Sequence, residues 1–285
     1  MKHAFLIIAH NEPVVLAELI RCLDDVDNDI FIHWDKKQTF SPHIATRYSR
    51  LEWLENRIDV RWGDITQIMS EYVLFETAYR TADYDYFHLI SGTHLPLKSQ
   101  QQIHSFFEKH SGKQFLMPIV QSDTQIDMKM RQYHLFIRSM HIGSLSRQLF
   151  FQRLWHLCLI IQNFFGIHRN QSTIFCPASN WLSLTRDAVR YLLEHKKDIM
   201  RQYRYSFCGD EFFIPTALAN SPLKDTLFFY DKYLKVDMND ANACVYEMKD
   251  LDDLLHSDCL FARKFSAQHP DLIKRIIEQT QIDTD

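Results

Sequence analysis

The stretch Ala4-Phe5-Leu6-Ile7-Ile8-Ala9-His10-Asn11 decides the fold of this chain. Six apolar residues in a row have the length of a buried strand, and the polar pair that follows ends it. Pro13 then begins a helix, whose apolar face we expect to contain Val14, Leu16, Leu19, Ile20 and Leu23. A buried strand followed at once by an amphipathic helix is the first half of a βαβ unit.

Strands and helices continue to alternate along the first third of the chain. The sequence predicts strands at 29–34, 58–62 and 84–90, and helices at 42–51 and 66–80. Ser99 is placed to cap one more helix. We therefore expect an α/β fold with a mostly parallel central sheet flanked by helices. With only six Gly and eight Pro in 285 residues, the chain shows no linker, and we expect a single domain over 1–285.

The composition excludes several classes of protein. A net charge of −4 gives no reason to expect a nucleic-acid partner. The six cysteines are scattered without CxxC pairs, so a zinc site is not expected and reduced thiols are the simplest account. Residues 1–3 lead straight into the first strand without a secretory signal, and no apolar run reaches membrane-spanning length. These features predict a cytoplasmic protein.

Polar residues follow the predicted strands. His10, Asp35, Gly63 and Ser91-Gly92-Thr93 each come where a strand ends. The carboxyl ends of parallel strands meet at one edge of the sheet, where ligands bind in such folds. We therefore expect a ligand site at this edge.

The sequence limits which ligand this site takes. It contains neither the GxGxxG pattern nor a P-loop. A nucleotide fits if Asp35 contacts the ribose or base with His10 beside it, although Asp35 is equally explained as a plain turn carboxylate. No Asp-x-Asp ends a strand in the first half, so the usual carboxylate ligands for a diphosphate-bound metal are missing.

Two adjacent carboxylates follow a glycine in Gly209-Asp210-Glu211-Phe212-Phe213. An acid pair at a loop-to-helix corner suits a general base, because backbone donors can hold one carboxylate while the other faces a ligand. The plainer interpretation is that Asp210 caps a helix and Glu211 is a solvated residue of its first turn.

A further segment, His88-Leu-Ile-Ser-Gly-Thr-His-Leu-Pro-Leu-Lys98, resembles the LSGxDxPLK segment of the core-2/I-branching β-1,6-N-acetylglucosaminyltransferases and peptide O-xylosyltransferases. His94 replaces the usual aspartate. Other matches to this family follow in the same order along the chain: residues 9–11 with 32–37, then 60–63, 180–186, 209–213 and 260–265. Each segment is short, but together they extend the resemblance from about residue 4 to residue 265.

The resemblance implies a fold, a reaction and several roles. The fold is the GT-A type, a Rossmann-like single domain in which we assign 1–110 to nucleotide binding and 111–285 to acceptor binding and catalysis. Members of the family invert the anomeric carbon without a metal or other cofactor. By position, Glu211 corresponds to the catalytic base, Lys264 to the lysine on the donor diphosphate and Asp35 to the aspartate on uridine.

The expected site residues divide into two groups. The donor residues are His10, Asp35, Gly63, Lys235, Arg263 and Lys264. The acceptor residues are Arg131, Tyr133, Trp181 and Asp210. Lys129 and His134 join Arg131 and Tyr133 in a basic and aromatic cluster that fits a sugar and its phosphate, or equally a solvated loop.

The chain departs from the family in three ways. Positions 241–243 lack the family's second diphosphate-binding cation, an arginine, so Lys235, Lys249 or Arg263 would have to replace it. His94 in place of aspartate changes the loop after the fourth predicted strand, and with it the acceptor. The disulfides and membrane anchor of eukaryotic members have no counterpart, which fits a bacterial relative acting in the cytoplasm on glycans under construction.

The segment 145–167 is crowded with aromatic and aliphatic residues, and arginines and histidines surround it. Such a segment is either a buried core helix or a helix lying in a membrane interface. We favour the core helix. The alternative predicts peripheral contact with the inner face of the plasma membrane and a glycan acceptor that is lipid-linked.

Two hypotheses for function follow. The first is an inverting glycosyltransferase that moves GlcNAc or a related hexose or pentose from a UDP-sugar to a glycan hydroxyl, forming a β-linkage in bacterial surface polysaccharide biosynthesis. The second is a catalytically inactive binding or assembly subunit with a sugar-nucleotide fold. A hydrolase is a weaker choice, because the adjacent Asp210 and Glu211 cannot easily flank one glycosidic bond.

Overall fold

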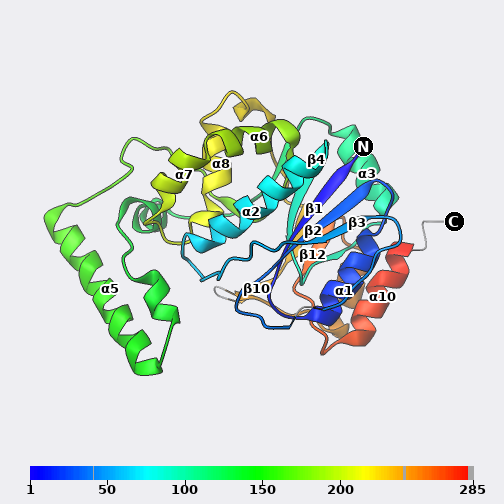
Figure 1. The fold of residues 1–285 in the computed structure, drawn as a ribbon, viewed down its shortest axis with the longest axis horizontal. Helices are drawn as coiled ribbons and strands as arrows, with labels where there is room; N and C mark the ends of the chain where they lie inside the picture. The colour runs from blue at the N-terminus through cyan, green and yellow to red at the C-terminus, as the bar shows by residue number, and fades with distance from the viewer. Residues whose placement is uncertain (41, 240–241, 282–285) are drawn as a thin grey trace.

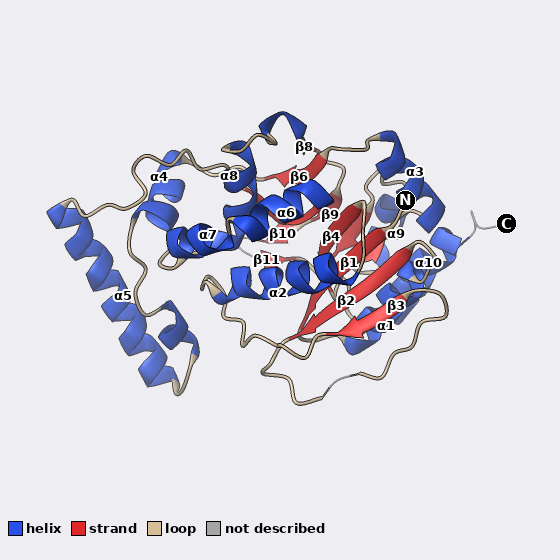
Figure 2. Ribbon diagram, turned by 45° about the horizontal axis from the view of Figure 1, so that its top comes forward, coloured by secondary structure: helices blue, strands red, loops and turns tan. Residues whose placement is uncertain are grey.

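The computed structural model describes residues 1–40, 42–239 and 242–281. Position 241, within the stretch where the family carries its second arginine, lies outside these ranges. The described chain forms a central sheet covered by helices on both faces, with one long helix standing apart (Figures 1 and 2).

The central sheet has seven strands in the order β3-β2-β1-β4-β7-β6-β8. Their bounds are β1 His3–Ala9, β2 Asn28–Trp34, β3 Arg50–Trp53, β4 Tyr86–Ser91, β6 Gln114–Pro118, β7 Ala178–Thr185 and β8 Leu227–Phe229. The first four are parallel to one another, β6 is parallel to β8, and β7 runs antiparallel to both of its neighbours. The prediction of a mostly parallel α/β sheet is confirmed. Strands from both 1–110 and 111–285 contribute to it.

The helices cover the two faces of this sheet. One face carries α1, α3 and α10, and the other carries α2 and α6 (Figures 1 and 2). The described helices are α1 Pro13–Leu23, α2 Thr66–Thr81, α3 Gln100–Lys109, α4 Asp123–Ile126, α5 Leu145–Phe165, α6 Arg186–Glu194, α7 Lys196–Tyr203, α8 Phe213–Ala219, α9 Leu251–Leu255 and α10 Pro270–Gln281. Ser99 caps α3 in a capping box with Gln102, as predicted. No described helix is both long and apolar enough to cross a bilayer.

A small sheet of order β5-β12-β9 lies beside the central one. It joins β5 Leu95–Pro96, β12 Phe261–Arg263 and β9 Leu234–Val236, and β10 Met238–Asn239 pairs with β11 Asn242–Ala243 in a separate hairpin. Because β5 follows β4 directly, this pairing brings the C-terminal segment with Arg263 to the end of β4.

Two predicted elements are wrong. Residues 42–49 form a loop rather than a helix, since the Asp24 carboxylate accepts hydrogen bonds from the backbone N–H groups of Arg47, Tyr48 and Ser49 at 2.6–3.0 Å. The third parallel strand is therefore β3, and 58–62 is not a strand. The backbone N–H of Ile58 donates instead to Nε2 of His33, the second-to-last residue of β2, at 2.8 Å.

Two burial predictions also fail. In α1, Val15 is buried in place of Val14, which is 54% exposed, while the other four predicted residues of the apolar face are buried. The helix expected in the core, α5, is not a core helix, because Gln162 is the only fully buried residue among its 21. Eight of its large apolar side chains are instead 44–82% exposed.

Candidate active site

The carboxyl ends of the parallel strands form one edge, as the sequence predicted. His10 follows β1, Asp35 follows β2, and the turn of Ser91–His94 follows β4. β6 has the same direction as β4, because both are antiparallel to β7, and Gln121 follows its end. These four loops define the candidate site.

Glu211 is held at this edge by two side chains. Its Oε2 accepts a hydrogen bond from Gln121 at 2.8 Å and pairs with the Lys129 ammonium at 2.8 Å. The Glu211 side chain stays 32% exposed. It lies in a 3-10 turn, Gly209–Glu211, directly before α8 rather than inside its first turn. The arrangement fixes one carboxylate oxygen and leaves the group accessible to solvent.

A second acidic pair lies behind Glu211. Asp210 is 6% exposed, and its Oδ2 accepts from Nε2 of Gln67 at 2.7 Å. Its Oδ1 and both oxygens of Glu71 are buried without a partner among the described residues. Burial and the charge of Glu211 raise the pKa of Asp210 to about 7, and burial together with Asp210 raises the pKa of Glu71 well above its usual range. Near neutral pH Asp210 is therefore partly protonated, and the protonated form of Glu71 is favoured.

Gly63 anchors the loop that carries the acid pair. Its carbonyl accepts from the Cys208 backbone N–H at 3.1 Å. Its φ is +73°, and an added Cβ would lie 2.4 Å from Cε2 of Phe207. Only glycine fits both the left-handed backbone and this contact. Gly63, expected at the donor, thus contacts the loop before Glu211.

Arg263 and Lys264 supply positive charge at the same edge. Among the described residues, neither side chain forms an ion pair with an acidic group. Burial lowers the pKa of Arg263 to about 10, so the guanidinium stays charged at neutral pH. Its Nε is buried and has no hydrogen-bond partner within the described part of the chain. Phe265 donates its backbone N–H to the Thr93 carbonyl at 3.1 Å, which fixes this segment against the turn after β4.

His94 and Trp181 surround the Arg263 guanidinium. The guanidinium lies 5.1 Å from the Trp181 ring, and the ring centroids of His94 and Trp181 are 5.2 Å apart. Burial and the neighbouring Arg263 lower the pKa of His94 well below its usual range, so the imidazole is neutral. An aspartate at this position would place a carboxylate beside the cation, whereas the neutral histidine leaves the charge of Arg263 unpaired. Trp181, expected at the acceptor, therefore contacts a donor candidate.

His10 lies among the charges of the donor candidates. Desolvation lowers its pKa, the Asp35 carboxylate raises it, and the charges of Lys264, Lys37 and Arg263 lower it further. The loop after β1 is also tied to the C-terminal segment, because the Glu12 carboxylate accepts from Ser266 Oγ and Ala267 N–H, both at 2.8 Å. The structure thus brings together His10, Asp35, Arg263 and Lys264.

The Asp35 carboxylate is occupied within the protein. It is 4% exposed and accepts from both the backbone N–H and the ammonium of Lys37, at 2.8 and 2.7 Å. A ligand hydroxyl or imide would therefore have to share or displace the Lys37 ammonium.

Three further candidates have partners inside the protein. Lys235 pairs with Asp253 at 2.7 Å. Arg131 pairs with Asp127 and donates to the carbonyls of Asn170 and Thr173, so it fastens a loop. Tyr133 is 37% exposed and stacks under Arg169 at 5.4 Å.

Sequence reasoning missed three residues of the site: Gln121, Gln67 and Glu71. It named Lys129 only as part of a cluster that fits a sugar and its phosphate, or equally a solvated loop, whereas Lys129 pairs with Glu211. Gln67 and Glu71 are one turn apart on α2, and this spacing was the one sequence signal that could have placed both beside Asp210.

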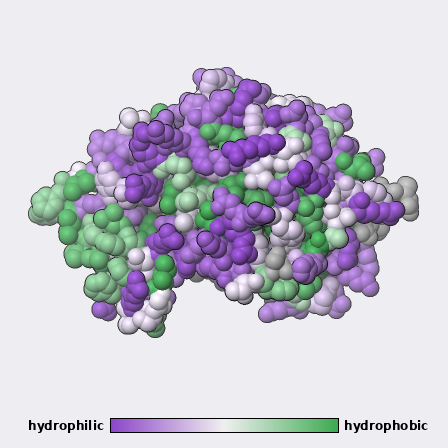
Figure 3. Space-filling model, in the orientation of Figure 1, coloured by the Kyte–Doolittle hydropathy of each residue, from purple (hydrophilic) through white to green (hydrophobic). Residues whose placement is uncertain are grey.

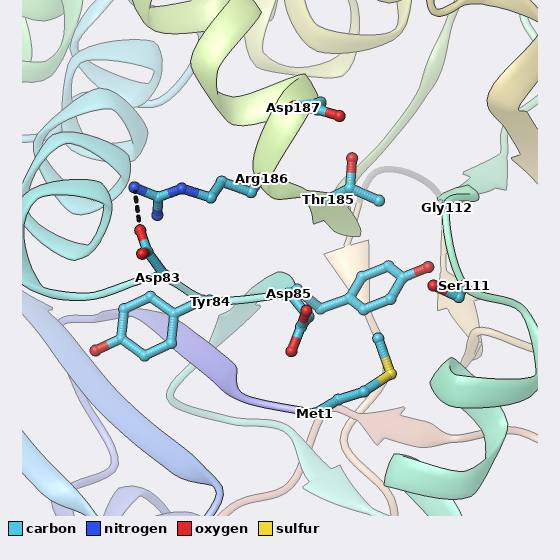
Figure 4. A pocket seen from close by; sticks show the side chains of 10 residues that line it. Met1, Asp83, Tyr84, Asp85, Ser111, Gly112, Thr185, Arg186 and Asp187 are labelled. Carbon is cyan, nitrogen blue, oxygen red and sulfur yellow. Dashed lines mark ion pairs between the residues drawn. The ribbon is translucent and has the colours of Figure 1, made fainter.

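A cavity of about 260 Å³ lies at the opposite edge of the sheet (Figure 4). Met1, before β1, and Thr185, at the end of antiparallel β7, line it, and Arg186 pairs there with Asp83 at 2.8 Å. A second cavity of about 470 Å³ lies between Trp53 and residues 42–45. Neither is lined by Glu211 or Lys264. Within the described residues, the three potential metal ligands that lie close together, Asp25, Asp27 and His104, precede β2 or belong to α3, away from Glu211.

The sequence model of the Core-2/I-Branching enzyme family matches residues 3–234. This chain belongs to the core-2/I-branching enzyme family. The match covers the strands of the central sheet together with Glu211 and Lys129, but not Arg263 or Lys264. This branching-family protein is therefore a member of a glycosyltransferase family.

Two curated proteins are similar to it. Xylosyltransferase 2 of Rattus norvegicus is 23% identical over 268 residues, and that of Canis lupus familiaris 21% identical over 266. Each alignment covers 89% of this branching-family protein but 28% of the relative, so the chain spans about a quarter of the length of these relatives.

Solved structures match less closely. Mouse xyloside xylosyltransferase 1 aligns over 92% of this chain and 96% of its own, with 8% identity and a TM-score of 0.39. Mannose-6-phosphate isomerase of Helicobacter pylori covers 70% of this chain and 78% of its own, with 11% identity and a TM-score of 0.34. Scores this low do not distinguish a transferase from an isomerase.

Proposed function

We propose that this protein is an inverting glycosyltransferase that moves GlcNAc or a related sugar from a UDP-sugar to a glycan hydroxyl, forming a β-linkage. Glu211 is the base that takes the proton of the acceptor hydroxyl, which then attacks the anomeric carbon as UDP leaves. The observation that carries this proposal is the fixed yet accessible Glu211 carboxylate, with Oε2 held by Lys129 and Gln121 at 2.8 Å each.

The buried acids behind the base support its role. Asp210 has a pKa raised to about 7, so it is partly neutral at physiological pH and repels the Glu211 carboxylate less than a full charge would. The Lys129 ammonium lies 2.8 Å from Oε2 of Glu211 and orients the carboxylate that takes the proton. The residues thus keep one carboxylate ready and a second one partly protonated.

Arg263 and Lys264 are assigned to the donor diphosphate. The leaving UDP gains negative charge as the sugar departs, and a positive group must stabilise it in the transition state. Both cations lack an acidic partner among the described residues, and both lie near His10 and Asp35. We therefore propose that the two side chains act without a divalent metal ion.

The cellular setting is part of the proposal. All six cysteines are free, which fits a reducing compartment, and we propose that the enzyme acts in the cytoplasm of a bacterium on surface polysaccharide under construction. The acceptor would be a glycan.

The test is a panel of UDP-sugars read by thermal shift and by release of UDP, with and without chelator. We expect one donor at a hundredfold excess over its Kd to stabilise the fold by about 2.7 kcal/mol and to be hydrolysed slowly in chelator. A donor that binds without release of UDP, with every acceptor offered, would favour the inactive binding subunit. Failure of every UDP-sugar to bind would refute both.

A further inference from the structure

Helix α5 stands away from the body of the protein at the left of Figure 1. Six exposed apolar residues lie on one side of this helix, two of them at 149–150 and four within 157–164: Leu149 44%, Phe150 62%, Leu157 51%, Ile160 64%, Ile161 44% and Phe164 82% exposed. We call these six residues the α5 outer face. Figure 3 shows a hydrophobic patch at that end of the molecule. A water-exposed surface of this kind marks an interaction site.

The opposite side of α5 is fixed to the protein. Gln162 accepts from the Tyr133 backbone N–H at 2.7 Å and donates to the Tyr133 carbonyl at 2.9 Å. Trp155 donates from Nε1 to Nδ1 of His134 at 3.0 Å, and Phe151 lies 5.8 Å from the Phe136 ring. The helix is therefore held in one orientation, with its outer face directed away from the body.

The charge around α5 differs from that of the whole chain. Residues 128–185 contain six Lys and Arg residues and no Asp or Glu, whereas the whole chain has a net charge of −4. Arg147 and Arg153 belong to α5 itself, and both are exposed. Lys129, Arg131 and Arg138 pair with acids elsewhere in the chain, so among the described residues the cations of this segment without an acidic partner are Arg147, Arg153 and Arg169. Exposed apolar side chains accompanied by such cations are the composition of a helix that lies in an anionic membrane interface.

We propose that α5 seats this protein on the surface of an anionic phospholipid membrane. The α5 outer face enters the boundary between head groups and acyl chains, while Arg147 and Arg153 contact lipid phosphates. The charge of the segment selects lipid over a second copy of this chain, because two such helices would bring their arginines together without acids to pair them.

Membrane binding by α5 also predicts the chemical class of the acceptor, and this step rests on the proposed function. The Trp155 ring lies 5.7 Å from the Phe207 ring, and the Phe207 backbone N–H donates to the Lys129 carbonyl at 2.9 Å. Lys129 in turn pairs with Glu211. A membrane under α5 would bring lipid-linked glycans near the base, so we assign the acceptor to that class.

Sedimentation with vesicles tests membrane binding by α5 without donor or acceptor, so its outcome is separate from that of the transferase assay. The wild-type protein should sediment with phosphatidylcholine vesicles that contain phosphatidylglycerol, and much less with pure phosphatidylcholine or at high salt. Ile160→Glu with Phe164→Glu should lower binding at least about tenfold. Val26→Glu is the matched control, because Val26 is 71% exposed and lies between α1 and β2. It should bind like the wild type.

A second pair of variants leaves the apolar face intact. Arg147→Gln and Arg153→Gln should each weaken binding to anionic vesicles about fivefold, and thermal melts should match the wild type. This pair decides the outcome if the glutamate variants unfold. The proposal is overturned if the wild type stays in the supernatant at low salt, if both variant pairs bind normally, or if the protein dimerises through α5 and ignores vesicles.

Discussion

The Lys129 ammonium lies 2.8 Å from Oε2 of Glu211, and the two side chains are 18% and 32% exposed. The pair joins a π-helical turn, Asp127–Arg131, to the loop before α8. Gln121 donates to the same oxygen. One oxygen of the carboxylate is thus oriented by two donors, and the second can meet the acceptor hydroxyl.

Replacing Lys129 tests the importance of this orientation. Lys129→Met should lower kcat by about one to two orders of magnitude with little change in UDP affinity, because the base loses its partner while the donor site is untouched. Lys129→Arg should retain more activity, since it keeps a cation. Equal turnover of Lys129→Met and the wild type would show that the ion pair plays no part in catalysis.

The donor site is tested with two lysines. Lys264→Ala should weaken UDP binding about tenfold, because a cation without an acidic partner is removed from the diphosphate. Lys235→Ala is the comparison, since Lys235 already pairs with Asp253 at 2.7 Å and should matter less. Isothermal titration with UDP measures both. A larger loss of UDP affinity for Lys235→Ala than for Lys264→Ala would mean that Lys235, and not Lys264, is the lysine that binds the diphosphate.

Much of the fold was predictable from the strands, because runs such as Ala4–Ala9 are buried on both faces of a parallel sheet. Glu211 could be named from its short motif. Lys129 could not be assigned, because its contact with Glu211 spans 82 positions and depends on the fold of the intervening chain. The helix expected at 42–51 failed because the Asp24 carboxylate, some twenty residues earlier, holds that backbone in a loop. For α5, composition does not reveal which side the protein covers.

The buried carboxyl of Glu71 predicts a dependence of stability on pH. Burial and the neighbouring Asp210 raise the pKa of Glu71 in the folded chain. In the unfolded chain the pKa of glutamate is about 4.3, so the folded chain keeps this proton to a higher pH. The stability that this group contributes is complete below about pH 4.3 and is lost as the pH rises through the raised pKa. Glu71→Gln cannot lose a proton, so its Tm should exceed that of the wild type by about 3 °C or more at pH 8.

Thermal melts between pH 5 and 9 measure this effect. The difference in Tm between Glu71→Gln and the wild type should grow with pH. Glu194→Gln is the control, because the Glu194 side chain is 62% exposed, and its difference should stay near zero. A difference for Glu71→Gln that stays constant over this range would mean that the buried carboxyl does not titrate as described.

The close contact between Gly63 and Phe207 can be tested by comparing alanine substitutions at Gly63 and at Gly112. Both have a positive φ, +73° and +83°, but an added Cβ meets Phe207 at 2.4 Å in one case and open space in the other. Gly112→Ala should cost about 1–2 kcal/mol from backbone strain alone. Gly63→Ala should cost about 1–3 kcal/mol more, because Phe207 must move. Equal losses of unfolding free energy for the two variants, measured by urea denaturation, would show that the contact with Phe207 does not constrain position 63.

We propose that Glu211 is the base of a glycosyl transfer from a UDP-sugar that needs no metal. The most direct measurement is release of UDP from the best donor by the wild type and by Glu211→Gln, each in excess chelator, with UDP affinity measured in parallel. We predict that the wild type stays active in chelator, and that Glu211→Gln binds UDP normally but turns over about two to four orders of magnitude more slowly. Retention of most turnover by Glu211→Gln, or wild-type activity that chelator abolishes and manganese restores, would contradict the account.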